Sequence, residues 1–348
     1  GVSRFAPWLV AAALASGLGI LAWVHFREKP TESTILSYQL SLPENASDVQ
    51  SFAISPDGKY LVFAATVDKK RQLHLRPMGA LQDQPLPFTE DATYPFWSPD
   101  SKSIAFFAYG KLKRLSVLGG TSVVLADAPD PRGGSWGADG TIVFAPRANG
   151  PLYRIPAAGG PAVALPTDAQ EGESDRFPFF LPDGRHFLFV KLATARADAE
   201  RQLLVGSLDG SVRKLLGNTQ SQPAFVSMAD GSGSLLRVLN GSLTAQQLDA
   251  KALTLVGEPA DLPFRPLIAN NASAAYTASD NGLLVWQGNT AEREAILTWH
   301  DRQSNVVSKL GEPHNYLSFR ISRDGTQVAA SLTDQGRDIW LVSTDRGV

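Results

Sequence analysis

From residue 50 onward one phrase recurs along the chain: a short apolar strand, a turn centred on aspartate, and a second apolar strand. The clearest copies are SPDGKYLVF (55–63), SPDSKSIAF (98–106), GADGTIVFA (137–145) and LPDGRHFLF (181–189), and weaker copies are MADGSGSLL (228–236), ASDNGLLVW (278–286) and SRDGTQVAA (322–330). The turn residues of the seven copies are Asp57, Asp100, Asp139, Asp183, Asp230, Asp280 and Asp324. They follow one another at intervals of 39 to 50 residues. A period of roughly 40–50 residues with several strands per unit is typical of β-propeller blades.

Each copy also has the composition of a blade. The Asp-Gly or Asp-Ser pair at the turn supplies the backbone freedom and hydrogen bonds that a tight reversal needs. A third strand follows, for example LKRLSV (112–117) or ILTWHD (296–301), and no stretch after residue 30 keeps a helical period for ten residues. We therefore predict an all-β fold, a single propeller of seven four-stranded blades. Six or eight blades also fit, because the copy around Asp230 is the weakest.

The two ends of the repeat array suggest how the ring closes. The last copy has three strands by Ser343, so it is one strand short at Val348. The alternating segment ILSYQLSLP (35–43) precedes the first copy and has no blade of its own. We predict that it forms the outer strand of the last blade, since such pairing would remove exposed strand edges. The predicted propeller thus covers residues 35–348.

The segment before the propeller is apolar enough to cross a membrane. Residues 8–26 read WLVAAALASGLGILAWVHF and carry no full charge. A helix of this length is about 28 Å long, close to the hydrocarbon thickness of a bilayer. We predict a transmembrane helix at 8–26, a juxtamembrane stub at 1–7 and a linker at 27–34. A cleaved signal peptide is the alternative, because Ala13-Leu14-Ala15 resembles a cleavage site.

Small residues lie on one stripe of this predicted helix. Ala11, Ala15 and Gly19 are spaced four residues apart, which would let two helices approach closely and form a homodimer. The alternative is that alanine and glycine are simply common in spanning helices. The orientation is open on charge alone, since one more basic residue follows the helix than precedes it.

Composition excludes several classes of function. The chain has 32 basic and 34 acidic residues, a formal net charge of −2 and no cysteine. The basic excess that marks nucleic-acid binding is missing, so we expect no nucleic-acid partner. Disulfides and thiolate metal sites are ruled out. The G-x-G-x-x-A match at 17–22 lies in the apolar helix without a preceding strand, so it predicts no dinucleotide. We expect no cofactor and no metal.

Candidate catalytic residues are weak. Ser135 lies in a G-x-S-x-G match, but that segment leads into a turn and a strand rather than into the helix that a nucleophile elbow requires. The five histidines show no metal-binding spacing, and each turn aspartate stands alone, unlike the clustered ligands of a calcium loop. The aromatic residues near the turns fit packing between blades, and lining of a central channel is the alternative. We predict no catalytic residue.

The order of these phrases resembles a known family. LPENASDVQSFAISPDGKYLVF (42–63), YPFWSPDSKSIAFFAYGKLKRL (94–115), GGSWGADGTIVFAPRANGPLYRIPAAGG (133–160) and FPFFLPDGRHFLFV (177–190) are similar to the TolB-like, WD-repeat-like propeller of bacterial transmembrane serine/threonine protein kinases. So is FRISRDGTQVAASLTDQGRDIWLVSTDRGV (319–348). The resemblance covers about nine-tenths of the chain. The kinase domain that precedes the helix in that family is absent from this sequence, so phosphoryl transfer would belong to a preceding segment.

The resemblance implies a location and a role. The chain is expected to lie in the bacterial inner membrane as a single-pass protein, with the propeller outside the cytoplasm. The leading hypothesis is a non-catalytic sensor or interaction domain whose protein or small-molecule ligand binds on a propeller face, while residues 8–26 contact the lipid bilayer. The alternative is a membrane-anchored TolB-like periplasmic scaffold that binds envelope proteins. A propeller enzyme is a third hypothesis, which would need acidic or histidine residues converging on the channel.

Overall fold

The computed structural model describes residues 46–348, apart from residues 81, 194–199, 228–231, 270, 289–294, 301–305, 315, 333–337 and 345–348. The chain divides into two compact units, 1–42 and 43–348, and all described residues lie in the second. The predicted helix at 8–26 with its stripe, the linker at 27–34 and the closing strand at 35–43 therefore lie outside the described residues. Within the described part of the chain, no helix is both long and apolar enough to span a bilayer.

The described strands form antiparallel sheets in which chain neighbours pair in order, which is the meander expected of propeller blades. The first sheet contains β1 (Ala46–Ile54), β2 (Tyr60–Val67), β3 (Lys70–Pro77) and β4 (Gln84–Pro85). The second contains β5 (Thr93–Trp97), β6 (Ser103–Ala108), β7 (Lys111–Ser116) and β8 (Val123–Asp127). The third contains β9 (Gly134–Trp136), β10 (Thr141–Phe144), β11 (Tyr153–Pro156) and β12 (Val163–Ala164).

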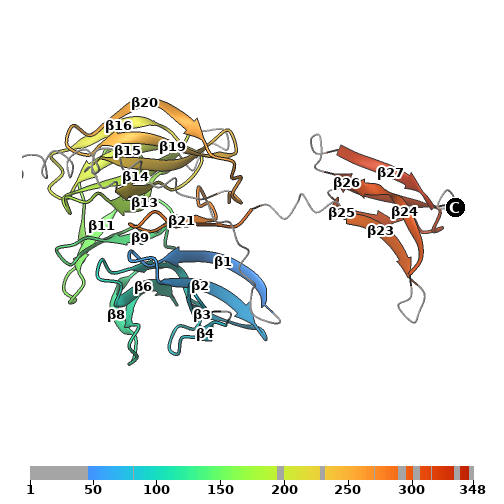
Figure 1. The fold of residues 1–348 in the computed structure, drawn as a ribbon, viewed down its shortest axis with the longest axis horizontal. Helices are drawn as coiled ribbons and strands as arrows, with labels where there is room; N and C mark the ends of the chain where they lie inside the picture. Colours follow the sequence, from blue (N-terminus) through green and yellow to red (C-terminus); the bar gives the residue numbers. More distant parts are fainter. Residues whose placement is uncertain are drawn as a thin grey trace, which may run out of the picture. The chain divides into compact units, whose positions relative to one another are not determined.

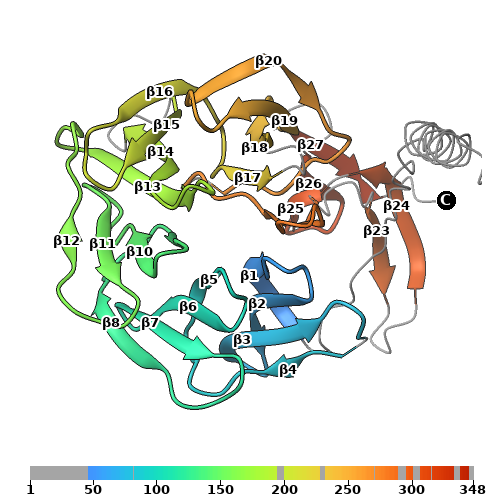
Figure 2. The ribbon, with the colours of Figure 1, turned by 60° about the vertical axis from the view of Figure 1, so that its left-hand side comes forward.

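Two further four-stranded sheets and one shorter sheet follow. The fourth sheet contains β13 (Glu173–Phe180), β14 (His186–Ala193), β15 (Gln202–Ser207) and β16 (Arg213–Asn218). The fifth contains β17 (Ala224–Ser227), β18 (Gly233–Leu239), β19 (Ser242–Asp249) and β20 (Thr254–Asp261). The sixth contains β21 (Tyr276–Ala278) and β22 (Leu284–Trp286). Figure 1 labels many of these strands, and Figure 2 shows the successive sheets arranged around a ring.

The ring closes where β21 meets β1. Ile54 N donates to Thr277 Oγ1 at 3.3 Å, and Asp280 N donates to Pro56 O at 3.1 Å. Asn281 Nδ2 also donates to Asp57 O at 3.1 Å. These bonds join the first and the sixth sheet, although they are more than 200 residues apart in the sequence. The first sheet and the β21–β22 sheet are therefore neighbours, and the sheets of residues 46–288 follow one another around a ring as in a β-propeller.

The hydrophobic core lies between neighbouring sheets. Val62 and Leu73 of the first sheet pack with Ile104 and Phe106 of the second, and all four are fully buried. Equivalent clusters fill the interfaces between the second and third, third and fourth, fourth and fifth, and fifth and sixth sheets. Both faces of a blade are therefore buried, which explains why its middle strands read as nearly continuous apolar runs.

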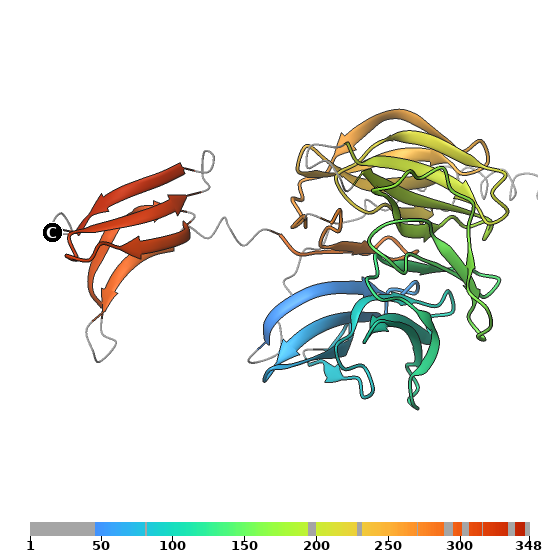
Figure 3. The same cartoon turned by 180° about the vertical axis from the view of Figure 1, so that it is seen from behind.

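The last strands are described by themselves. β23 (Ala295–His300) pairs with β24 (Val306–His314), and β25 (Tyr316–Ile321), β26 (Gln327–Leu332) and β27 (Asp338–Ser343) form a three-stranded sheet. These are the strands at the red end of the colour scale in Figure 3. The sequence pattern makes 296–301 the third strand of the blade that contains β22. In the described residues the corresponding strand, β23, pairs with β24 instead.

Candidate functional site

The first strands of the second and fourth sheets share a backbone irregularity at the same place. Tyr94 and Phe177 each precede a proline and have positive φ angles of 46° and 51°, and the strand register shifts at both places. Each lies six residues before its turn aspartate, as does Gly133, whose φ is 80°. A left-handed backbone is costly for bulky residues. The cost is offset here by packing, because the two aromatic rings meet edge to face with centroids 5.8 Å apart.

Residues from three separate sheets meet at this point. Phe177, Val190 and Ala272 form a buried cluster against which Tyr94 packs, and Asn271 Nδ2 donates to the Tyr94 hydroxyl at 2.8 Å. We call these five residues the axial cluster. They come from the second sheet, the fourth sheet and the segment just before the sixth. Since these sheets are not neighbours, their side chains can touch only at the ring centre. Burial raises the pKa of Tyr94, so its hydroxyl stays protonated.

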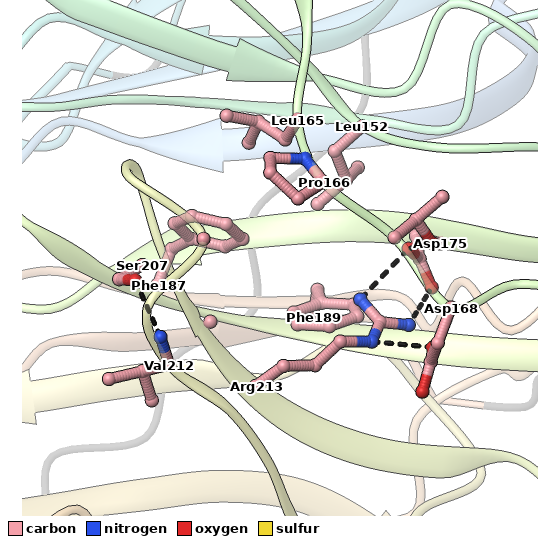
Figure 4. Close-up of a pocket in the computed structure, with 13 residues that line it drawn as sticks. Leu152, Leu165, Pro166, Asp168, Asp175, Phe187, Phe189, Ser207, Val212 and Arg213 are labelled. Carbon is pink, nitrogen blue, oxygen red and sulfur yellow. Dashed lines mark hydrogen bonds and ion pairs between the residues drawn. The ribbon is translucent and has the colours of Figure 1, made fainter.

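A pocket of about 170 Å³ lies between the third and fourth sheets (Figure 4). Its walls are apolar and come from both sheets: Leu152, Leu165, Pro166, Phe187 and Phe189. A pocket of this size matches a small aromatic or aliphatic group, since cavities near 150 Å³ accept benzene.

A glycine on the neighbouring strand leaves room for the rings that line this pocket. A Cβ on Gly206 of β15 would lie 3.1 Å from the Phe189 ring and 3.2 Å from the Phe187 ring. Glycine at this position therefore lets the backbone approach both aromatic side chains closely.

Charged side chains form one end of the pocket. The Arg213 guanidinium donates to both carboxylate oxygens of Asp175, at 2.9 and 3.1 Å, and its Nε donates to Asp168 Oδ1 at 2.6 Å. It also lies 4.9 Å from the centre of the Phe189 ring, within cation–π range. Figure 4 shows these three hydrogen-bonded groups converging beside the aromatic wall. The Asp175 side chain is 3% exposed, so Arg213 neutralises a charge that water does not reach.

Asp168 and two charged groups linked to it, Lys191 and Glu173, have pKa values shifted away from neutral pH. Burial opposes ionisation of Asp168, but Arg213 and Lys191 outweigh it and lower the pKa of the Asp168 carboxyl. Burial likewise opposes the charge on Lys191, yet its bonds to Glu173 and Asp168 raise its pKa. The backbone N–H of Gln170, together with Lys191, lowers the pKa of Glu173. These three groups therefore keep their charges throughout the neutral range.

A wider groove of about 480 Å³ lies between the second and third sheets. Val124, Pro129, Tyr153 and Ala162 are among its lining residues, and Arg147 is at its edge. Val123 and Val124 of β8 are 47% and 55% exposed, and Val163 of β12 is 47% exposed. Apolar residues on neighbouring outer strands thus flank this groove.

The predicted turn residues occupy different positions. Asp57, Asp100, Asp139 and Asp183 each accept hydrogen bonds from backbone N–H groups two or three residues later, in the turn after the first strand of their sheet. Asp324 makes the same bond in the turn between β25 and β26.

The other two turn residues do not show this arrangement. In the sixth sheet Asn281, rather than its neighbour Asp280, takes the equivalent place, because the Ser279 hydroxyl bonds to the Asn281 side chain. Asp230 lies outside the described residues. The structure thus distributes these residues over separate turns and does not gather them in one site.

The other residues singled out in the sequence take part in hydrogen bonds or in packing between sheets. Ser135 Oγ accepts a hydrogen bond from Phe180 N at 3.0 Å, which ties the third sheet to the fourth. His186 contacts Asp183 within its own turn. Trp97, Phe96 and Phe180 lie in the clusters between sheets. Among the described residues, no group of three potential metal ligands occurs.

Sequence reasoning missed the charged end of the pocket and the axial cluster. Arg213 and Asp175 are 38 residues apart and meet only through folding. For the axial cluster, the sequence did contain a signal that could have been used. The Tyr-Pro and Phe-Pro pairs lie at the same offset before their turns, as expected for a recurring backbone bend.

No protein-family model matches this chain, and no curated protein matches it. Solved structures do match. TolB from Acinetobacter baumannii is 14% identical over 58% of this chain and 51% of its own, with a TM-score of 0.47. A putative TolB from Agrobacterium tumefaciens is 19% identical over 50% and 68%, with a TM-score of 0.44. The Dos1 propeller is 12% identical over 87% and 94%, with a TM-score of 0.46. The match thus spans about half of the first TolB structure.

An enzyme also occurs among the similar structures. An oligogalacturonate lyase in complex with manganese is 14% identical over 84% of this chain and 87% of its own, with a TM-score of 0.49. These likenesses include TolB proteins, a propeller and a lyase. At such identities and TM-scores they carry no argument about what this chain does.

Proposed function

We propose that this chain is a non-catalytic binding propeller, a sensor or interaction domain that a helix at 8–26 tethers to the bacterial inner membrane. The propeller would lie outside the cytoplasm and report ligand binding through that helix. Any kinase activity would belong to a preceding segment, as the sequence resemblance implies. The proposal rests on the ring scaffold and on the chemistry of the pocket between the third and fourth sheets.

The observation that carries the proposal is an apolar pocket closed at one end by the paired charges of Arg213, Asp175 and Asp168. A general acid or base works best with a pKa near the operating pH. Asp168, which lines the pocket, instead has a lowered pKa because Arg213 and Lys191 outweigh its burial. Lys191 lies beside the pocket and is paired with Asp168 and Glu173, which raises its own pKa and lowers that of Glu173. Such groups hold fixed charges and orient a neighbour. Together with aromatic walls, they favour a site that binds an apolar group without transforming it.

Binding at the pocket can be tested with a small probe. We expect indole to raise the melting temperature of the protein in a saturable way, because it fits the apolar walls and binds only the folded state. Val212→Trp should abolish this effect by filling the pocket, which Val212 lines. Leu118→Trp is the matched control, since Leu118 is 87% exposed and does not line the pocket. Unchanged melting with both indole and benzene would overturn the binding role of this pocket.

The location is tested separately. The sequence contains no cysteine, so Leu118→Cys would create a unique and exposed thiol. We expect a membrane-impermeant maleimide to label this variant in spheroplasts that are still sealed. Labelling only after lysis would place the propeller in the cytoplasm and would overturn the extracytoplasmic part of the proposal.

A protein-binding scaffold is the second candidate, and the groove between the second and third sheets favours it. Exposed apolar side chains on adjacent outer strands, Val124 and Val163, are typical of protein contact surfaces. The two candidates differ in where substitutions act. A scaffold would lose partner binding with Val124→Asp, whereas a pocket-based sensor would lose its ligand response with Val212→Trp.

A further inference from the structure

Arg176 is a buried cation at the centre of the ring. The residue is 2% exposed, and its guanidinium donates to Ser174 Oγ at 2.8 Å, to Asn271 O at 3.0 Å and to Ala148 O at 2.7 Å. All three acceptors are neutral. In the described part of the chain Arg176 has no ion pair with a carboxylate. Burying an unpaired charge is expensive, and such charges are usually paired.

Arg132 lies beside the strand that carries Arg176, because Phe177 N donates to Arg132 O at 2.8 Å. Burial and the charge of Arg132 together lower the pKa of Arg176 to about 10. Arg132 Nη1 is held by Asp130 Oδ1 at 2.5 Å and by Pro131 O at 2.7 Å. Its Nε is buried and has no hydrogen-bond partner among the described residues. A buried donor without a protein acceptor is rare, and a bound water or ion is a common partner for such a group.

A third arginine contributes to the same local charge. Arg201 also lowers the pKa of Arg176 through its charge, and burial lowers the pKa of Arg201 itself. Arg201 Nη1 donates to Gln220 O at 2.8 Å. Asp130 also influences Arg176, but its carboxylate is paired with Arg132. Among the described residues, no carboxylate is paired with Arg176 itself.

We propose that the ring centre beside the axial cluster binds an anion. The anion would be a phosphate or carboxylate group held by Arg132 and Arg176, with Arg201 nearby. The unpaired N–H of Arg132 supplies a donor, and the planar guanidinium groups suit both anions. Arg176 also bonds the third sheet and the segment before the sixth sheet through backbone carbonyls. These bonds explain its position, but they leave its charge uncompensated, and an anion would compensate it.

The site is separate from the pocket in Figure 4, whose lining contains none of the three arginines. Loss of anion binding would therefore leave the indole response of the pocket intact. Loss of the indole response would likewise leave anion binding unaffected. The two proposals thus fail independently.

The test uses the full chain and measures thermal unfolding with inorganic phosphate and with citrate, each against sodium chloride at equal ionic strength. We expect at least one of the two anions to raise the melting temperature saturably beyond chloride, because a ligand of the folded state stabilises it. The phosphate and citrate arms distinguish the two anion chemistries. Equal effects of all three salts would mean simple screening and would overturn the proposal.

Substitutions test whether the anion binds at the proposed site. Arg132→Gln should weaken the apparent anion affinity about tenfold or more, because a charge-assisted hydrogen bond is lost. Arg154→Gln is the matched control, since it removes an exposed positive charge from β11 of the same sheet. Arg201→Gln should weaken the affinity several-fold, and it carries the test if Arg132→Gln does not fold. An affinity that falls as much with Arg154→Gln as with Arg132→Gln would contradict a defined site.

Discussion

At the residue scale, the best-defined interaction is the one between Arg213 and Asp175. Two parallel hydrogen bonds join a guanidinium that is 19% exposed to a carboxylate that is 3% exposed. The sequence could not have predicted this pair. Asp175 lies near the start of β13 and Arg213 at the start of β16, so their contact depends on how the sheet pairs and twists. Local sequence patterns carry no such information.

Removal of one partner should therefore be costly. We expect Arg213→Gln to lower the free energy of unfolding by about 3 kcal/mol, because it leaves the Asp175 carboxylate buried without a counter-charge. Arg185→Gln is the control. It breaks a surface pair with Asp209 in which the side chains are 58% and 52% exposed, and such pairs contribute about 1 kcal/mol or less. Urea unfolding of both variants measures the difference, and equal losses would contradict the assignment.

At the element scale, the turn after the first strand is the recurring unit. Ser98 Oγ donates to Asp100 Oδ1 at 2.6 Å, and Lys102 N donates to the same oxygen at 3.1 Å. Ser55 and Asp57 repeat this arrangement, so a short Ser-x-Asp phrase encodes the whole turn. This part of the fold could be predicted because every bond is local. In Ser279-Asp280-Asn281, the turn residue is the one two positions after the serine, which is Asn281. A search for aspartates alone picks Asp280, one position too early.

This turn should respond to acid. The hydrogen bond from Ser98, followed by that from Lys102 N, lowers the pKa of Asp100. The ionised carboxylate thus stabilises the folded state above its ordinary pKa of 3.8, and this contribution is lost as the pH falls through the lowered value. We expect Ser98→Ala to cost about 1–2 kcal/mol at neutral pH, and less as the pH falls below 3.8.

Ser116→Ala is the control for this prediction. Ser116 Oγ only accepts from an exposed N–H, that of Leu118, so its removal should change stability by about 0.5 kcal/mol or less. Urea unfolding at a series of pH values measures both variants. A pH-independent cost for Ser98→Ala would show that the charge of Asp100 plays no part.

At the scale of the whole ring, closure is the feature that sequence reasoning resolved least. The period of the turns predicted an all-β propeller, because each blade repeats the same local pattern. The number of sheets that close the ring depends instead on which strand meets β1. The structure gives that place to β21 through Thr277 and Asn281. No local sequence feature of these residues predicts a contact between segments so far apart in the sequence.

If the ring closes through β21, residues 43–288 should fold on their own. The apolar clusters described between its successive sheets lie within this range, so removing 289–348 takes away none of their residues. We expect the shortened chain to unfold cooperatively, with a melting temperature within about 4 °C of that of residues 43–348. Calorimetry would check this, and a broad, uncooperative transition would mean that the ring needs the later strands.

The closure also has a mechanical consequence. Buried apolar clusters fill the interfaces between successive sheets from the first to the sixth, whereas in the described residues hydrogen bonds of Ile54, Asp280 and Asn281 join the sixth sheet to the first. Hydrogen bonds near a surface yield to water more readily than an apolar interface does. A force applied to the two ends of the segment 46–288 would therefore separate β1 from β21 first. The apolar interfaces between the other sheets would remain intact.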